Sequence, residues 1–181
     1  MLHFFKAELV DAEAIATLIN NAYRGEPSRK GWTTEANILD GLRTTTAEVA
    51  SIIKRNDAFI LMGVENDEVV ATICCELQVI AFKHTVHFSL ITVKPTLQNK
   101  GHGKDIINAA ETMTKREWRV AGYHMMVISL RNELIAFYER LGYERTGEVK
   151  DFPVDSPLWE PKVDGLQLQY LAKLSGMVLK K

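Results

Sequence analysis

The chain has 181 residues, of which 46% are hydrophobic and 25% are charged, and its formal net charge at neutral pH is -1. This length and mixture are typical of a water-soluble globular protein, so we expect residues 1–181 to form one domain. The balanced charge argues against nucleic-acid binding and against attraction to an acidic membrane surface. No apolar run approaches the roughly 18 residues that a membrane-spanning helix requires.

The start of the chain and its cysteines indicate a cytoplasmic protein. Residues 1–8 lack the basic start and the apolar stretch of a secretion signal. The only cysteines, Cys74 and Cys75, are neighbours in sequence and would point to opposite faces of a strand. A disulfide is therefore not expected, which fits a reducing compartment. The sequence leaves the oligomeric state open, and a homodimer is compatible with it.

The first third of the chain alternates between strand and helix patterns. Apolar residues at helical spacing follow Asp11, which can cap the helix that they predict. The glycine, proline and charges of Arg24–Gly31 predict a loop. The other elements expected here are a strand at Phe4–Glu8, a short helix at Thr34–Leu42 and a second helix at Thr46–Lys54 with Thr46 as its cap.

Strand patterns dominate the middle of the chain, and the whole predicts a mixed α/β domain. We expect three consecutive antiparallel strands at Ala58–Glu65, Glu68–Phe82 and Thr85–Val93, with a turn at Asn66 and Asp67. The remaining elements are a helix at Gly103–Arg119, a strand at Tyr123–Leu130, a helix at Glu133–Leu141 that Gly142 can terminate, and strands at Tyr143–Val149 and Gln167–Lys173. The fold class is therefore α/β, with a mostly antiparallel sheet and flanking helices. The long connection Asp151–Asp164 is of the kind that often forms a lid or a binding loop.

The most informative segment links the strand that ends at Val93 to the helix that follows. Its loop holds Gly101 and Gly103, with Lys100 and Lys104 beside them. The first N–H groups of a helix lack internal partners, and glycines let a phosphate approach the backbone, so this loop suits an anion. It lacks the third glycine of a dinucleotide-binding loop and the flanking residues of a P-loop. A plain strand-to-helix turn is the structural alternative.

Two patterns in this region resemble the signatures of one enzyme family. Val93-x-Pro95 followed by Gln98-x-x-Gly101-x-Gly103 resembles the acyl-CoA loop of the GNAT superfamily of N-acetyltransferases. A second set, separated from the first by a helix and a strand, is similar to the family's other signature and consists of Asn132, Ala136, Tyr138, Gly142 and Tyr143. The order of the elements agrees over nearly the whole chain.

The resemblance implies a GNAT-like acyl-CoA N-acyltransferase fold with acetyl-CoA as the co-substrate. In that fold the strand ending at Val93 splays from the strand Tyr123–Leu130, and the two central strands form a V-shaped cleft. The pantetheine arm would pair with the backbone of that first strand, and the pyrophosphate would contact N–H groups of the loop. The implied cofactor-binding residues are Ile91, Val93, Gln98, Asn99, Lys100, Gly101, His102, Gly103, Lys104, Asn132 and Tyr138.

The implied reaction transfers an acetyl group to a primary amine of a small molecule or peptide by direct attack in a ternary complex. Tyr138 is the predicted general acid, because a phenol with a pKa near 10 can donate a proton to a thiolate with a pKa near 8.5. Many members of the family place a glutamate before Val-x-Pro, and this strand has none. His87 is the candidate base, with Ser89 on the same face to position water, while Glu26 and Glu35 are alternatives.

Two further expectations concern ligands. His84 and His87 would point to opposite faces of their strand, and no partner has ligand spacing, so we expect no metal site. The residues expected to contact the amine are Tyr23, Glu26, Trp32 and Glu35, whose aromatic rings and carboxylates suit an ammonium group. Arg24, Arg29 and Lys30 favour instead an acceptor with a carboxylate or phosphate, so the acceptor class stays open.

A non-catalytic acyl-CoA-binding or regulatory module with the same fold is the alternative function. Its only support is the missing glutamate on the strand before Val93. The presence of Asn132 and Tyr138 counts against it.

Overall fold

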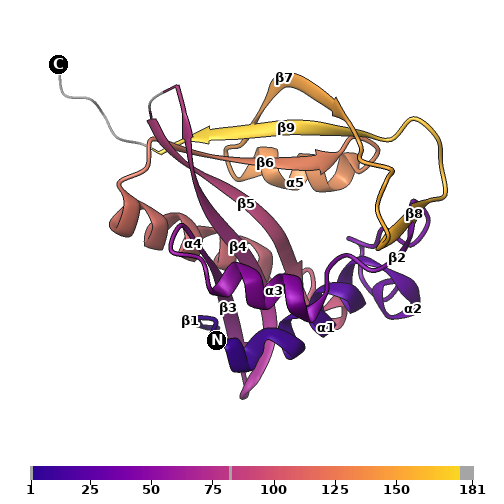
Figure 1. The fold of residues 1–181 in the computed structure, drawn as a ribbon, viewed down its shortest axis with the longest axis horizontal. Helices are drawn as coiled ribbons and strands as arrows, with labels where there is room; N and C mark the ends of the chain where they lie inside the picture. Colours follow the sequence, from indigo (N-terminus) through magenta and orange to yellow (C-terminus); the bar gives the residue numbers. More distant parts are fainter. Residues whose placement is uncertain (1, 82, 176–181) are drawn as a thin grey trace.

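The computed structural model describes residues 2–81 and 83–175, and one seven-stranded sheet runs through this part of the chain (Figure 1). Its strands are β1 (His3–Lys6), β3 (Ala58–Glu65), β4 (Glu68–Ile80), β5 (Lys83–Val93), β6 (Gly122–Ile128), β7 (Glu144–Asp151) and β9 (Gln167–Leu174). The helices are α1 (Ala12–Tyr23), α2 (Gly25–Ser28), α3 (Thr46–Ile53), α4 (His102–Trp118) and α5 (Asn132–Arg140), with 3-10 turns η1 (Leu9–Asp11) and η2 (Pro95–Leu97). Two short strands, β2 (Leu39–Gly41) and β8 (Trp159–Pro161), form a separate sheet.

The large sheet has the order β1-β3-β4-β5-β6-β9-β7 and is mostly antiparallel. Its one parallel pair joins β5 to β6, and α4 provides the crossover that such a pair needs. This pairing covers only Thr85–His87 against Gly122–His124. Beyond His87 and His124 the two strands diverge, and Figure 1 shows β5 running away from β6 towards α1 and β2. The predicted mixed α/β class and the V-shaped splay are both present.

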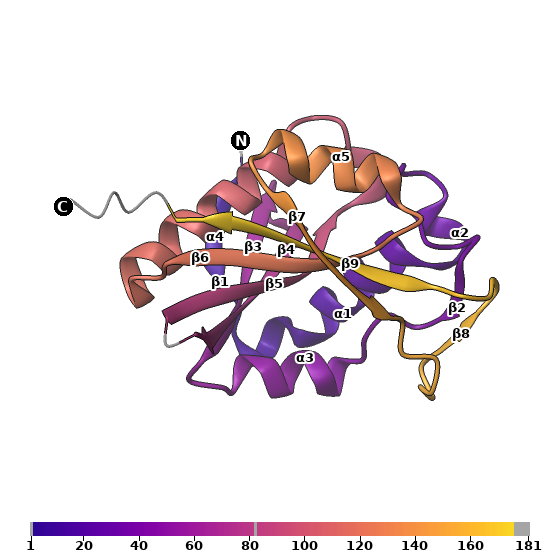
Figure 2. The ribbon, with the colours of Figure 1, turned by 90° about the horizontal axis from the view of Figure 1, so that it is seen from above.

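Helices cover the two faces of the sheet, and each face has its own core (Figure 2). Side chains of α1 and α3 pack on one face with Ile60 and Cys74, whereas α4 and α5 pack on the other face with Leu61 and Cys75. The two neighbouring cysteines are therefore buried on opposite sides of β4 as free thiols. Within the described residues, every helix is too short or too polar to cross a membrane.

Most predicted elements are confirmed to within a few residues. The three middle strands pair consecutively and antiparallel, although Phe82 lies outside the described residues. Asn66 and Asp67 make the tight turn between β3 and β4, with φ angles of 52° and 61°. Both angles are positive, as the turn that suits a two-residue hairpin requires.

Three predictions for residues 24–54 are wrong in detail. Thr34–Leu42 forms turns and β2 rather than a helix, because β2 pairs with β8 from the distant 151–164 connection. Thr45, not Thr46, caps α3, and its hydroxyl accepts a hydrogen bond from the backbone N–H of Glu48 at 3.1 Å. The predicted loop 24–31 contains the single-turn α2.

Asp11 precedes α1 as predicted but does not cap it with its side chain. Its carboxylate instead accepts the backbone N–H of Glu8 at 2.8 Å, which closes a capping box around η1.

The β2–β8 sheet depends on a glycine at position 41. Gly41 has φ +90°, and a Cβ there would lie 2.1 Å from the carbonyl oxygen of Leu158. We expect Gly41→Ala to lower the free energy of unfolding by about 3 kcal/mol, because it adds a backbone clash to the left-handed strain of about 1–2 kcal/mol. Gly165→Ala is the matched control, since Gly165 has φ +67° with nothing within 4 Å of its Cβ position. Equal losses for both variants in urea unfolding would contradict this role of Gly41.

Candidate active site

The site begins where β5 and β6 stop pairing. One extra residue on β5 forms a bulge opposite β4, where the register shifts between Thr72 and Cys74. Leu90 takes φ +50° in this bulge, and its carbonyl oxygen accepts the hydroxyls of Thr72 at 3.2 Å and Thr92 at 3.0 Å. The carbonyl of Ile91 accepts the hydroxyl of Tyr23 at 3.0 Å. The bulge thus turns the β5 backbone into the cleft at Ile91.

The loop before α4 has the geometry of an anion site. Asn99 and Gly101 both adopt left-handed conformations, with φ angles of 64° and 92°, and α4 begins at His102. No side chain caps the start of this helix, so its first N–H groups are left for another partner. Such groups and the helix dipole attract negative charge.

A cavity of about 170 Å³ lies between this loop, β5 and α5, and we call it the cofactor cavity. Most of the residues predicted to bind the cofactor line it, namely Ile91, Val93, Gln98, Asn99, Gly101, Gly103, Lys104 and Tyr138. Lys100 and His102 line a different, open hollow beside β1, and Asn132 is exposed at the start of α5. The loop therefore presents only some of its side chains to the cofactor cavity.

The Gln98 side chain links two segments of the cavity wall through hydrogen bonds. Its side-chain oxygen accepts the backbone N–H of Trp32 at 2.9 Å, and its amide donates to the Thr33 hydroxyl at 2.8 Å and to the Val93 carbonyl at 3.2 Å. Trp32 in turn packs edge-on against Phe137, with ring centroids 6.0 Å apart. Gln98 therefore fastens the 31–34 segment to the end of β5.

A second cavity of about 190 Å³ lies on the other side of the splay, and we call it the acceptor cavity. It is lined by β5 and β6 and by aromatic residues of the 151–164 connection, Phe152 and Trp159. The two cavities share Tyr23, Ile91, Arg131, Leu134 and Tyr138. They meet at these residues, so two ligands can approach each other from opposite sides.

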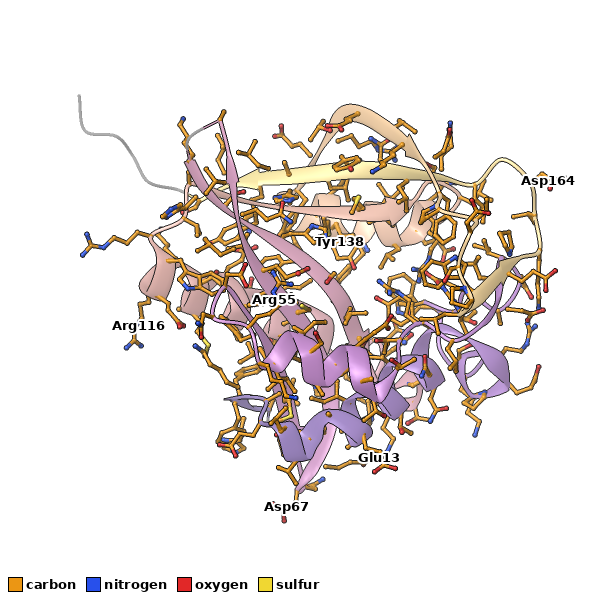
Figure 3. All side chains as sticks on the ribbon, in the orientation of Figure 1. Glu13, Arg55, Asp67, Arg116, Tyr138 and Asp164 are labelled. Atoms are coloured by element: carbon orange, nitrogen blue, oxygen red, sulfur yellow. The ribbon has the colours of Figure 1, made fainter. Side chains whose placement is uncertain are left out.

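Tyr138 lies at this junction, and Figure 3 shows it between the β6–β9 layer and β5. The side chain is 4% exposed, and burial raises the pKa of its phenol above the ordinary value of 10. The hydroxyl makes no hydrogen bond to any residue in 2–81 or 83–175. It is therefore a protonated donor that is available to a ligand.

His87 and Ser89 both line the acceptor cavity, on the same side of β5. His87 is nearly buried, and this burial lowers the pKa of its imidazole below 6.5. The ring centroids of His87 and His124, which lies on β6, are 5.0 Å apart. Burial, and to a smaller extent the nearby His87, lowers the pKa of His124 to about 4. Both imidazoles are therefore neutral at pH 7, and His87 can accept a proton from the cavity.

The two glutamates proposed as alternative bases lie in different environments. Glu26 is 88% exposed, pairs with Arg29 and lines neither cavity. Glu35 lines the acceptor cavity, but its two oxygens already pair with Arg24 at 3.3 Å and Arg131 at 2.8 Å. The structure thus keeps Glu26 apart from the other predicted site residues.

Arg131 and Arg43 are site residues that the sequence patterns did not identify. Arg131 lines both cavities and precedes α5, while Arg43 lines the acceptor cavity from the segment after β2. The position of Arg131 directly before Asn132 of the second signature was the one available signal. No sequence pattern indicated Arg43, because the β2–β8 pairing that brings its segment to the acceptor cavity was not predicted.

Across residues 2–81 and 83–175, no group of three or more His, Cys, Asp or Glu side chains is placed to hold a metal ion.

Comparisons with known proteins identify the family. A model of the acetyltransferase (GNAT) domain matches residues 56–145. Ribosomal-protein-S18-alanine N-acetyltransferase from Escherichia coli matches with a TM-score of 0.70 and 16% identity, over 100% of this chain and 98% of its own. An N-acetyltransferase from Staphylococcus aureus Mu50 gives 0.70 and 15%, over 97% and 98%. The spermidine/spermine N-acetyltransferase from Vibrio cholerae gives 0.67 and 15%, over 96% and 92%.

The chain therefore belongs to the GNAT acetyltransferase family, as its two signatures predicted. At these identities the structural matches show the shared fold. No curated protein sequence matches the chain significantly.

The two histidines at the splay make stability depend on pH. An unfolded histidine binds a proton at about pH 6.5, whereas His87 and His124 bind one in the folded chain only at lower pH. The unfolded chain therefore takes up more protons, and we expect the free energy of unfolding to fall as the pH drops from about 6.5 towards 4. Urea unfolding of His124→Gln should show a weaker pH dependence than the native chain.

His3→Gln is the control for this series, because His3 is exposed on β1. The interpretation of the histidine pair would be wrong if His3→Gln flattened the pH dependence as strongly as His124→Gln.

Proposed function

We propose that this protein is an N-acetyltransferase that transfers an acetyl group from acetyl-CoA to a primary amine by direct attack in a ternary complex. The observation that carries the proposal is the meeting of two cavities at Ile91 and Tyr138. One cavity has an anion-binding loop at its far end, and the other has neutral His87 in its wall. This arrangement supports one catalytic domain that brings two substrates together.

The residues of the cofactor cavity suit parts of coenzyme A, namely its diphosphate and the end of its arm, because a cavity of about 170 Å³ is too small for the whole molecule. The start of α4 has no side-chain cap, and Gly101 and Gly103 expose its backbone to a diphosphate. A Cβ at Gly103 would lie 3.3 Å from the ring of Phe137, so the helix start and α5 are already in close contact. Lys104 adds positive charge at the same place. Ile91 and Val93 present the β5 backbone along which an extended pantetheine arm can pair.

Each step of the reaction has a candidate side chain. Acetyl-CoA supplies the activated acetyl group, and an aliphatic amine with a pKa near 10 must lose a proton to become nucleophilic. His87 accepts this proton, directly or through water held by Ser89. Tyr138 donates its hydroxyl proton or a hydrogen bond to the departing sulfur, because its raised pKa keeps the phenol protonated.

Coenzyme A affinity should depend on the two glycines of the loop. Gly101→Val forces a side chain into φ +92°, and Gly103→Val pushes a side chain against Phe137, so both disturb the N–H groups that would bind the diphosphate. We expect each variant to weaken coenzyme A binding about tenfold or more in calorimetry.

Gly147→Val is the matched control, since Gly147 has φ +86° with nothing within 4 Å of its Cβ position and lies on β7. Unchanged affinity in the two loop variants, or an equal loss in the control, would count against this cofactor site.

Turnover should depend on the Tyr138 hydroxyl. We expect Tyr138→Phe to lower kcat about 100-fold, with little change in coenzyme A affinity, because the ring stays in its packed position between Phe137 and Tyr143. The measurement is thiol release from acetyl-CoA with a panel of amines. Tyr170→Phe on β9 is the control, because Tyr170 lines neither cavity. A native chain that binds acetyl-CoA and releases no thiol with any amine would instead favour the non-catalytic binding module.

A further inference from the structure

A buried ion triad of Arg24, Glu35 and Arg131 forms part of the wall of the acceptor cavity. Glu35 pairs with Arg24 at 3.3 Å through one oxygen and with Arg131 at 2.8 Å through the other. The side chains of Arg24 and Glu35 are only 3% and 5% exposed, and that of Arg131 is 10% exposed. Two guanidinium groups share one carboxylate, so the triad keeps one positive charge in excess.

Arg43 adds a second positive charge to the same cavity. Its backbone N–H donates to the side-chain oxygen of Asn20 at 2.7 Å, and this hydrogen bond holds the backbone at Arg43 in position. Its guanidinium lies over the ring of Tyr23, 5.5 Å from the centroid. Among residues 2–81 and 83–175, the Arg43 side chain forms no ion pair and no hydrogen bond. The guanidinium is thus held in place beside the cavity without a protein counter-ion.

The charge balance of the acceptor cavity favours an anion. Three arginines line it, and Glu35 is the only carboxylate among the described residues that do so. Positive charge in a partly buried site is costly unless a ligand compensates for it. A polyamine would meet like charges here, which opposes its binding.

The rest of the cavity limits the size of the ligand. Its volume of about 190 Å³ lies below the roughly 300 Å³ at which sites for drug-sized ligands begin. Phe152, Trp159, Met126 and Leu168 give it an apolar wall. A small molecule with an apolar part fits this space better than a long chain does.

Building on the proposed acetyltransferase function, we propose that the acceptor is a small amine that also carries a carboxylate or phosphate group, which Arg43 binds. Guanidinium groups suit both anions because their N–H groups form a planar fork. His87 and Arg43 both line this cavity of about 190 Å³. An acceptor held by its anion at Arg43 can therefore place its amine near His87.

Matched pairs of amines test this assignment. Thiol release from acetyl-CoA is measured with phenylalanine against phenylalaninamide, with phosphoethanolamine against ethanolamine, and with spermidine. The first pair tests a carboxylate and the second a phosphate. We expect the native chain to favour the anionic member of at least one pair by about 10- to 100-fold in kcat/KM, as a charged hydrogen bond allows.

Three variants assign the preference to Arg43. Arg43→Gln should raise KM for the anionic amine and leave the neutral one little changed, so that the preference disappears, while Arg43→Lys should restore part of it. Arg116→Gln removes one positive charge from α4, far from Tyr138 in Figure 3, and should leave the preference intact. The inference is wrong if spermidine or the neutral amines react best, or if Arg43→Gln preserves the preference.

A binding measurement decides the case in which no amine turns over. Calorimetry with coenzyme A present compares N-acetylphenylalanine with its amide and phosphoethanolamine with ethanolamine, and tighter binding of an anionic member that Arg43→Gln abolishes supports the anion site. Equal binding of both members of each pair overturns it. A chain without affinity for coenzyme A itself fails in a separate way, because that result removes the proposed function on which the inference rests.

Discussion

The divergence of β5 from β6 after His87 and His124 is the constraint on which the site depends. Strands that stop pairing leave backbone groups along their facing edges, and such groups need other partners. The bulge at Leu90 directs the β5 backbone into this gap, where the Tyr23 hydroxyl already takes the carbonyl of Ile91. Both cavities follow from the same divergence, one on each side of the point where Tyr138 lies.

Irregular chain segments form the walls of this gap, and polar contacts as well as hydrophobic packing hold them there. Gln98 ties the 31–34 segment to β5, and Glu35 ties the end of α1 to the start of α5 through Arg24 and Arg131. A buried ion pair adds little to stability once desolvation is counted, so its value here is to fix positions. The excess positive charge that results gives the acceptor side its own electrostatic character, distinct from the proposed diphosphate site at α4.

The sequence predicted most strands, the central helices and the glycine-containing loop before α4 because those features are local. Alternation predicted the hairpins, and Gly101 and Gly103 stand out before a helix. The segment from Thr34 to Leu42 was misassigned because a distant strand, β8, determines its structure. The same long-range pairing places Arg43 beside the acceptor cavity, and no local pattern could reveal an arginine whose role depends on it.

A crystal structure with coenzyme A bound would be the decisive test of the proposed cofactor site. We expect the diphosphate to contact the N–H groups at the start of α4, the arm to run beside Ile91 and Val93, and the sulfur to lie within hydrogen-bonding reach of the Tyr138 hydroxyl. Coenzyme A bound in the open hollow between β1 and α4, or with its sulfur directed away from Tyr138, would contradict this expectation.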